Sequence, residues 1–122
     1  MKEIFGLLIV VCLIVFQSSC YYDKEELLYP PINCDTVAIS YASKVKPILE
    51  TSCFACHSEA IQQNGIDLET FDQLKNYALN GSLLGSIKHA RGYSAMPQGG
   101  SKLSTCDIAA IESWIKAGTP QN

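Results

Sequence analysis

Five consecutive residues, Cys53 to His57, constrain this 122-residue chain more than any other feature. They read Cys-Phe-Ala-Cys-His, so two thiols lie three positions apart and an imidazole follows the second thiol directly. Each thiol can add to one vinyl group of a single porphyrin, and the imidazole can then bind the iron. This C-x-x-C-H arrangement is the signature of covalent c-type haem attachment. We therefore predict one haem c, held by thioether bonds to Cys53 and Cys56, with His57 as the proximal iron ligand.

Two other kinds of site also contain a C-x-x-C pair. A thioredoxin-like redox pair lies near a β-α-β pattern, and this sequence shows no such pattern. A structural zinc site needs four ligands, which usually come as two close pairs. The remaining candidate ligands are instead scattered singly along the chain: Cys34, His89 and Cys106. Haem attachment is the interpretation that uses both thiols and the adjacent imidazole together.

Residues 1–19 are predicted to be a signal peptide rather than part of the fold. Lys2 gives a weakly positive start, and an apolar run from Ile4 to Phe16 follows. This run is shorter than the ~20 residues that a membrane-spanning helix needs. Small polar residues then lead to Cys20, as in bacterial lipoprotein signals that are cut before a lipid-modified cysteine. Gln17 stands where such signals carry an aliphatic residue, so a plain secretory signal or an uncleaved anchor stays open.

Residues 20–35 are predicted to be a tether between a lipid anchor on Cys20 and a folded domain over residues 36–120. Acidic residues near its start resemble the surface-export signals of some lipoproteins, and they suit a solvated linker equally well. Pro30 and Pro31 favour an extended chain. Such an anchor holds a domain at a membrane without spanning it. We therefore expect an exported protein of the bacterial cell envelope, facing the periplasm or the cell surface.

The charge of the chain indicates which classes of partner to expect. The formal net charge is −3, and no cluster of Lys and Arg is dense enough to indicate nucleic-acid binding. A weak negative charge only mildly favours a basic partner surface. The partners expected are redox proteins of the cell envelope and, through the N-terminal lipid, the membrane itself.

Cys34 and Cys106 are left over when the other cysteines have been assigned to the signal peptide, the lipid anchor and the haem. An exported protein meets oxidising conditions, which favour disulfides. We predict a disulfide between these two residues, with two separate buried thiols as the alternative. It would close a loop of about 70 residues, for which the chain-entropy model gives roughly 4 kcal/mol as an upper value.

Hydrophobic spacing predicts an all-α fold of about four short helices. The first begins at Ser40 or Ser43 and runs to Ser52, with one apolar face that starts at Tyr41. Pro47 fits the first turn if Ser43 is the N-cap, and it kinks the helix if Ser40 is. The helix leads directly into the C-x-x-C-H motif, which places the motif at a helix C-terminus.

Three further helices are predicted. Thr70 is predicted to cap a helix over residues 71–80. Ser82 is predicted to start a short third helix that frays near His89. A loop rich in Gly and Pro follows over residues 91–100. Ser104 caps the last helix, whose apolar stripe and end signals are Ile108, Ile111, Ile115, Gly118 and Pro120.

Met96 is the candidate for the second axial iron ligand. It lies in the Gly/Pro loop, and the only other methionine is the initiator. A thioether ligand raises the reduction potential of a haem. His89 is the runner-up and would give a bis-His haem of lower potential. The plain alternatives are a gap-filling methionine and an exposed histidine at a helix end.

With these residues in place, the chain resembles the small class I cytochromes c over about residues 35–120. The resemblance rests on Pro47-Ile48-Leu49, the C-x-x-C-H motif, Met96-Pro97, Leu103-Ser104, Ile111, Trp114-Ile115 and Gly118. It implies an all-α fold around one haem, in which the first and last helices pack across each other near one haem edge. It also implies that His57 and Met96 are the axial ligands and that electrons leave through an exposed haem edge.

Three functions are open at this point. The resemblance implies electron transfer by a membrane-tethered mono-haem carrier, not an enzyme, whose iron cycles between the ferric and ferrous states. The second is a haem enzyme or a gas- or peroxide-responsive haem protein with an open or labile sixth position, for which His89 with Arg91 is the only distal pair on offer. The third is a colourless thiol-redox or zinc-binding module, in which Cys53 and Cys56 are free or bind a metal.

Overall fold

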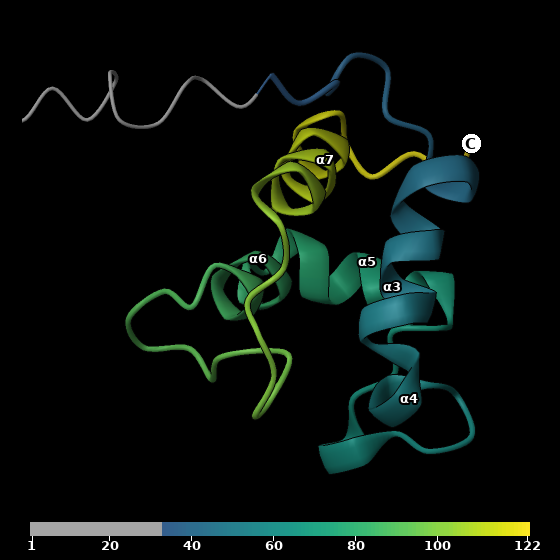
Figure 1. Cartoon of the computed structure of the whole chain (residues 1–122). Helices are drawn as coiled ribbons and strands as arrows, with labels where there is room; N and C mark the ends of the chain where they lie inside the picture. Colours follow the sequence, from purple (N-terminus) through teal and green to yellow (C-terminus); the bar gives the residue numbers. More distant parts are fainter. Residues whose placement is uncertain (1–32) are drawn as a thin grey trace, which may run out of the picture. The chain divides into compact units, whose positions relative to one another are not determined.

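The computed structural model describes residues 33–122, which contain helices and no β-strand (Figure 1). The all-α prediction is confirmed for this part of the chain. The predicted signal peptide over residues 1–19, the lipid anchor at Cys20 and most of the tether over residues 20–35 lie outside the described residues. No helix within residues 33–122 is long and apolar enough to cross a membrane.

Five α-helices and two short turns of other helix types follow one another in the described chain. Their bounds are η2 Tyr41–Val45, α3 Lys46–Ser52, α4 Phe54–His57, η3 Gln63–Gly65, α5 Phe71–Leu79, α6 Ser82–Ile87 and α7 Thr105–Lys116. The sequence predicted about four helices, and the difference arises at Cys53. Its backbone leaves the helical region, with φ −128° and ψ −40°, so the motif begins at the end of α3 and adds a turn of its own, α4.

The first helix begins at Ser40, whose hydroxyl accepts a hydrogen bond from the N–H of Ser43 at 3.4 Å. Its opening turn, η2, is a π-turn in which the N–H of Lys46 donates to the carbonyl of Tyr41. Pro47 then stands at the start of α3, where a residue without an N–H costs little. With Ser40 as the cap, the sequence predicted a kink at Pro47. The structure has a change from a π-turn to an α-helix there.

The side chain of Asp67 holds the turn that leads into α5. Thr70 occupies the N-cap position, but its side chain makes no capping hydrogen bond. The carboxylate of Asp67 accepts the N–H groups of Glu69 at 2.8 Å and Thr70 at 3.1 Å. Hydrogen bonding from Thr70, together with the Glu69 N–H, holds the pKa of Asp67 below its usual value. Thr70 is thus the N-cap residue, as predicted, but its side chain makes no capping hydrogen bond.

The last helix, α7, follows the sequence prediction closely. The Ser104 hydroxyl accepts the N–H of Asp107 at 3.1 Å, which confirms the N-cap. At the other end Gly118 has φ +90°, and its N–H donates to the carbonyl of Ile115 at 3.0 Å. The N–H of Thr119 donates in turn to the carbonyl of Trp114 at 3.1 Å. This pair of bonds is the usual way in which a left-handed glycine closes a helix.

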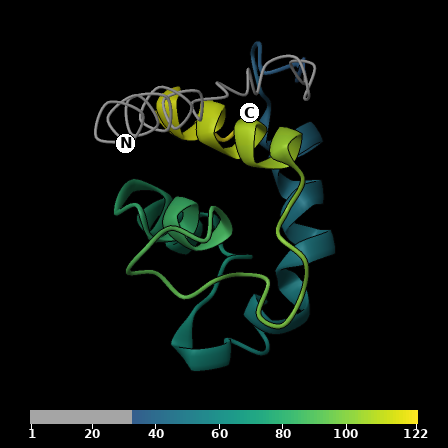
Figure 2. The same ribbon diagram turned by 60° about the vertical axis from the view of Figure 1, so that its left-hand side comes forward.

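The hydrophobic core gathers around Trp114 of α7, which is fully buried. Its ring lies 5.8 Å from that of Tyr41 and 6.3 Å from that of Phe71, and its Nε1–H donates to the carbonyl of Pro120 at 2.9 Å. Helix α7 packs against both η2 and α6. Figures 1 and 2 show α7 next to the first helix and to α6. The other buried core side chains are Val45, Leu49, Leu68, Leu74, Ala78, Leu83, Ile87, Ile108 and Ile111.

Asn122 closes the start of the first helix. Its side-chain oxygen accepts the N–H of Tyr41 at 2.9 Å, and its carbonyl accepts the N–H of Ala42 at 2.8 Å. The Ser40 hydroxyl also donates to this carbonyl at 2.9 Å. The first N–H groups of a helix have no partner inside it, so these bonds satisfy them. The predicted domain ended at residue 120 and so left out the hydrogen bonds of Asn122. No local sequence pattern indicates these bonds.

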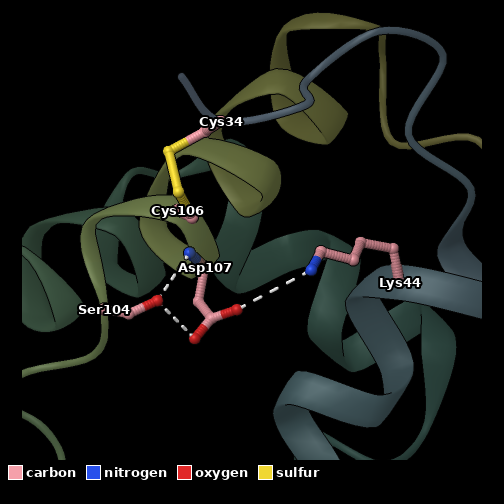
Figure 3. The surroundings of a disulfide bond; sticks show 5 residues. All are labelled: Cys34, Lys44, Ser104, Cys106 and Asp107. Atoms are coloured by element: carbon pink, nitrogen blue, oxygen red, sulfur yellow. Dashed lines mark hydrogen bonds and ion pairs between the residues drawn. A yellow bond between two sulfur atoms is a disulfide. The ribbon is translucent and has the colours of Figure 1, made fainter. Parts of the chain in front are cut away.

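Cys34 and Cys106 form a disulfide in the structure, with the two Cα atoms 5.1 Å apart (Figure 3). It joins the segment before the first helix to the first turn of α7. Beside it the Ser113 hydroxyl donates to the carbonyl of Thr36 at 2.9 Å. Lys44 and Asp107 form an ion pair at 3.9 Å (Figure 3). The predicted cysteine pairing is thus the one that the structure contains.

We predict that Cys34→Ser with Cys106→Ser lowers the free energy of unfolding by up to about 4 kcal/mol, because the unfolded chain gains the freedom of a long loop. Urea unfolding of the variant and the parent protein measures the difference. Ser113→Ala is the matched control, since it removes the neighbouring hydrogen bond and leaves the disulfide intact. Alkylation after reduction should label two more thiols than alkylation alone, and an equal mass in the two samples would contradict the disulfide.

Candidate functional site

A cavity of about 680 Å³ lies between the C-x-x-C-H motif, α5, α6 and the loop that joins α6 to α7. Figure 2 shows this loop leaving α6 and returning to the start of α7. Cys53, Cys56, His57 and Met96 all line the cavity, so the structure brings together the four residues that the sequence assigned to a haem. Its volume lies in the usual range for cofactor and ligand sites. The apolar part of its wall includes Ile66, Leu68, Leu83, Ile87 and Leu103.

His57 is buried, and its ring is fixed by the backbone. Its Nδ1 lies 3.3 Å from the carbonyl of Ile66, and a carbonyl can only accept, so Nδ1 carries the hydrogen. Nε2 is then the ring nitrogen whose lone pair is available to a metal. The carbonyl of His57 also accepts the N–H of Leu68 at 2.8 Å, which ties α4 to the segment before α5. Sequence reasoning missed the role of Ile66, because any residue can supply a carbonyl.

Cys53 and Cys56 are both free thiols and are not joined to each other. Cys53 is partly buried, and this burial raises its pKa to about 11, whereas Cys56 is exposed. Redox-active thiol pairs instead hold at least one cysteine at a lowered pKa. The surroundings of Cys53 are of the opposite kind, so Cys53 is poorly suited to be the attacking thiol of a redox pair.

The other candidate ligands of a zinc site are already engaged elsewhere in the structure. Cys34 and Cys106 are bonded to each other, and the ring of His89 contacts the carbonyl of Met96. Within residues 33–122, no three His, Cys, Asp or Glu side chains gather into a group that could hold a metal ion. A haem iron makes no such demand, because the porphyrin supplies four ligands and the protein only the axial ones.

Met96 enters the cavity from the α6–α7 loop, and its backbone is held at both polar groups. Its N–H donates to the carbonyl of Ser86 at 3.1 Å, and its carbonyl lies 3.0 Å from Nε2 of His89. Met96 is half-buried and lines the cavity, whereas His89 is exposed and does not. Between the two candidates for the second axial position, this arrangement favours Met96.

Tyr93 packs the same loop against α6. Gly85 is buried in the middle of that helix, and a Cβ placed there would come within 2.6–2.7 Å of three atoms of the Tyr93 ring. The ring therefore occupies the space that any larger residue at position 85 would need. The Tyr93 hydroxyl extends along the helix toward Gly81, where a Cβ would lie 3.7 Å from it. Sequence reasoning missed this contact, because a helical glycine does not identify its neighbour.

The donor set and the wall fit a haem. The cavity offers two free thiols, one imidazole nitrogen, one thioether sulfur and an apolar wall, and no charged side chain lines it. Two carboxylates, such as haem propionates, would meet neutral hydroxyl and amide donors there: Asn64, Tyr77, Ser82, Ser86, Tyr93 and Gln98. A smaller hollow of about 350 Å³ lies beside Cys106, and its described lining residues include no free thiol, imidazole or thioether.

Comparisons with protein-family models, with curated proteins and with solved structures find no match for this chain. The site is therefore interpreted from its own residues. The deciding observation is that one cavity holds both ends of the proposed ligand set, the motif and Met96.

We predict that Gly85→Ala destabilises the protein by about 1–3 kcal/mol, because the new methyl group overlaps the Tyr93 ring. In a Tyr93→Ala background the same change should be neutral or stabilising, since alanine is the better helix former. Thermal unfolding of the four proteins in this cycle measures the coupling. Equal effects of Gly85→Ala with and without the ring would contradict the contact.

Proposed function

We propose that this chain is a mono-haem c-type cytochrome of the class I type and that it transfers electrons. The observation that carries the proposal is the cavity lined by Cys53, Cys56, His57 and Met96. These residues come from two distant parts of the chain. A shared cofactor explains why two thiols, an imidazole and the only thioether of the described chain line the same apolar cavity. The packing of α7 against η2 supports the class I fold, in which the first and last helices cross.

Each residue has a definite part in this function. Cys53 and Cys56 would hold the haem through thioether bonds, and His57 would offer Nε2 to the iron because the Ile66 carbonyl fixes its other nitrogen. Met96 would supply its thioether sulfur as the second protein ligand. The bound haem supplies reversible one-electron chemistry at its iron. The apolar wall would exclude water from the bound group, and the two protein ligands would leave no position for a substrate.

The cellular setting is part of the proposal. A disulfide forms and persists in oxidising compartments, so the Cys34–Cys106 bond is consistent with export. We place the protein in the bacterial cell envelope, tethered by a lipid on Cys20, with redox proteins of that compartment as donor and acceptor.

The visible spectrum tests the proposed ligands. Protein made in a host with a haem-attachment system should show sharp ferrous c-type bands and, when ferric, the weak far-red band of sulfur-bound iron. Met96→Ala should abolish the far-red band, while Lys102→Ala, an exposed change in the same loop and outside the cavity wall, should keep it. A high-spin spectrum that shifts readily with added ligands would instead support the haem enzyme or gas sensor. A colourless but folded protein would support the thiol or zinc module.

Removing both attachment thiols tests whether the haem is also part of the core. Cys53→Ala with Cys56→Ala should give a colourless protein without a cooperative unfolding transition, because a chain this small would then enclose a large apolar cavity without its contents. Far-UV circular dichroism during thermal unfolding measures this. Cys34→Ser with Cys106→Ser is the control and should keep its colour. A double alanine variant that unfolds cooperatively at the temperature of the parent would contradict the haem-centred core.

A further inference from the structure

Both polar backbone groups of Met96 are hydrogen-bonded, although the residue lies in a Gly-rich loop. The carbonyl of Ser86, in the last turn of α6, accepts two N–H groups, that of Met96 at 3.1 Å and that of His89 at 3.1 Å. The side chain of His89 then reaches back to the carbonyl of Met96 at 3.0 Å. Three hydrogen bonds thus connect Ser86, His89 and Met96 into a closed unit, which we call the Met96 clamp.

The chemistry of the clamp fixes the role of the His89 ring. Because the carbonyl of Met96 can only accept, Nε2 of His89 must carry a hydrogen and donate it. A nitrogen that donates in this way has no lone pair for iron. The ring is exposed and lies outside the cavity wall, so it acts on Met96 and not on a bound group.

The backbone of His89 is shaped for this reach. Its φ is +54°, a left-handed conformation that few residues other than glycine adopt. The turn ends α6 and directs the side chain back along the loop. The same conformation means that any replacement of His89 by another non-glycine residue carries a similar backbone strain, so two different replacements can be compared directly.

We propose that His89 is a positioning residue that holds Met96 in place as the second axial ligand, without binding iron itself. The inference rests on the proposed function. With both the N–H and the carbonyl of Met96 fixed, the direction of its side chain is set before the sulfur meets the iron. The entropy of ordering the loop is then lost on folding rather than on ligation, which strengthens a bond that is weak on its own.

The test compares four ferric proteins: the parent, His89→Ala, His89→Gln and Arg91→Ala. Added imidazole must displace Met96 to bind iron, so a looser Met96 gives a lower apparent Kd for imidazole. Loss of one hydrogen bond predicts about tenfold tighter imidazole binding in His89→Ala and a weaker far-red band. His89→Gln should stay near the parent, because its amide N–H can donate to the same carbonyl. Arg91→Ala, an exposed change in the same loop, should behave as the parent.

The outcomes separate the two levels of the proposal. If Met96→Ala loses the far-red band while His89→Ala keeps the band and the imidazole Kd of the parent, His/Met ligation stands and the positioning role fails. If His89→Gln is as impaired as His89→Ala, the donated hydrogen bond is not what matters and the positioning role is again wrong. If the parent has no far-red band and Met96→Ala leaves its spectrum unchanged, the proposed ligation fails and the positioning role falls with it.

Discussion

The burial of Trp114 between Tyr41 and Phe71 is the interaction on which the rest of the structure depends. It joins the last helix to the first and, through Phe71, to the start of α5. Large aromatic side chains bury enough surface to dominate the energetics of a small core. The contact fixes where the first helix lies and therefore where its far end delivers the C-x-x-C-H motif. Asn122 and the disulfide reinforce the same junction from either end of the described chain.

Backbone carbonyls do much of the positioning at the candidate site. The carbonyl of Ile66 selects the tautomer of His57, and the carbonyl of Ser86 gathers Met96 and His89. These acceptors belong to the ends of secondary-structure elements, where carbonyl groups are free of helical partners. The proposed ligands of the two faces are thus supported by different segments, the turn before α5 and the last turn of α6. Each proposed ligand is oriented by a backbone carbonyl, that of Ile66 for His57 and that of Ser86 for Met96.

The environment of the cavity is consistent with a carrier rather than a reactive thiol site. Burial keeps the Cys53 thiol protonated, and the wall contains no charged group that would activate a thiol or a bound substrate. If the cavity holds the proposed haem, its apolar wall would favour electron transfer by keeping water from the iron. The charged groups of α6 and α7 instead pair with each other away from the cavity, as Lys88 and Lys116 do with Glu112.

The sequence by itself determined the local features of this protein. The thiol spacing around His57, the Ser104 cap, the Gly118 ending and the all-α pattern depend on neighbouring residues, and each was readable from them. Even the choice of Met96 followed from its being the only methionine after the initiator.

Only the tertiary structure decided which remote groups complete those features. Asn122 bonds the first N–H groups of the first helix, and Asp67 holds the turn that leads into α5. The Ile66 carbonyl orients His57, and the His89 ring donates to the carbonyl of Met96. These roles depend on backbone groups that every residue carries and on distances that folding alone sets. A sequence pattern records which side chains are present, but not which carbonyl a folded chain brings within hydrogen-bonding reach.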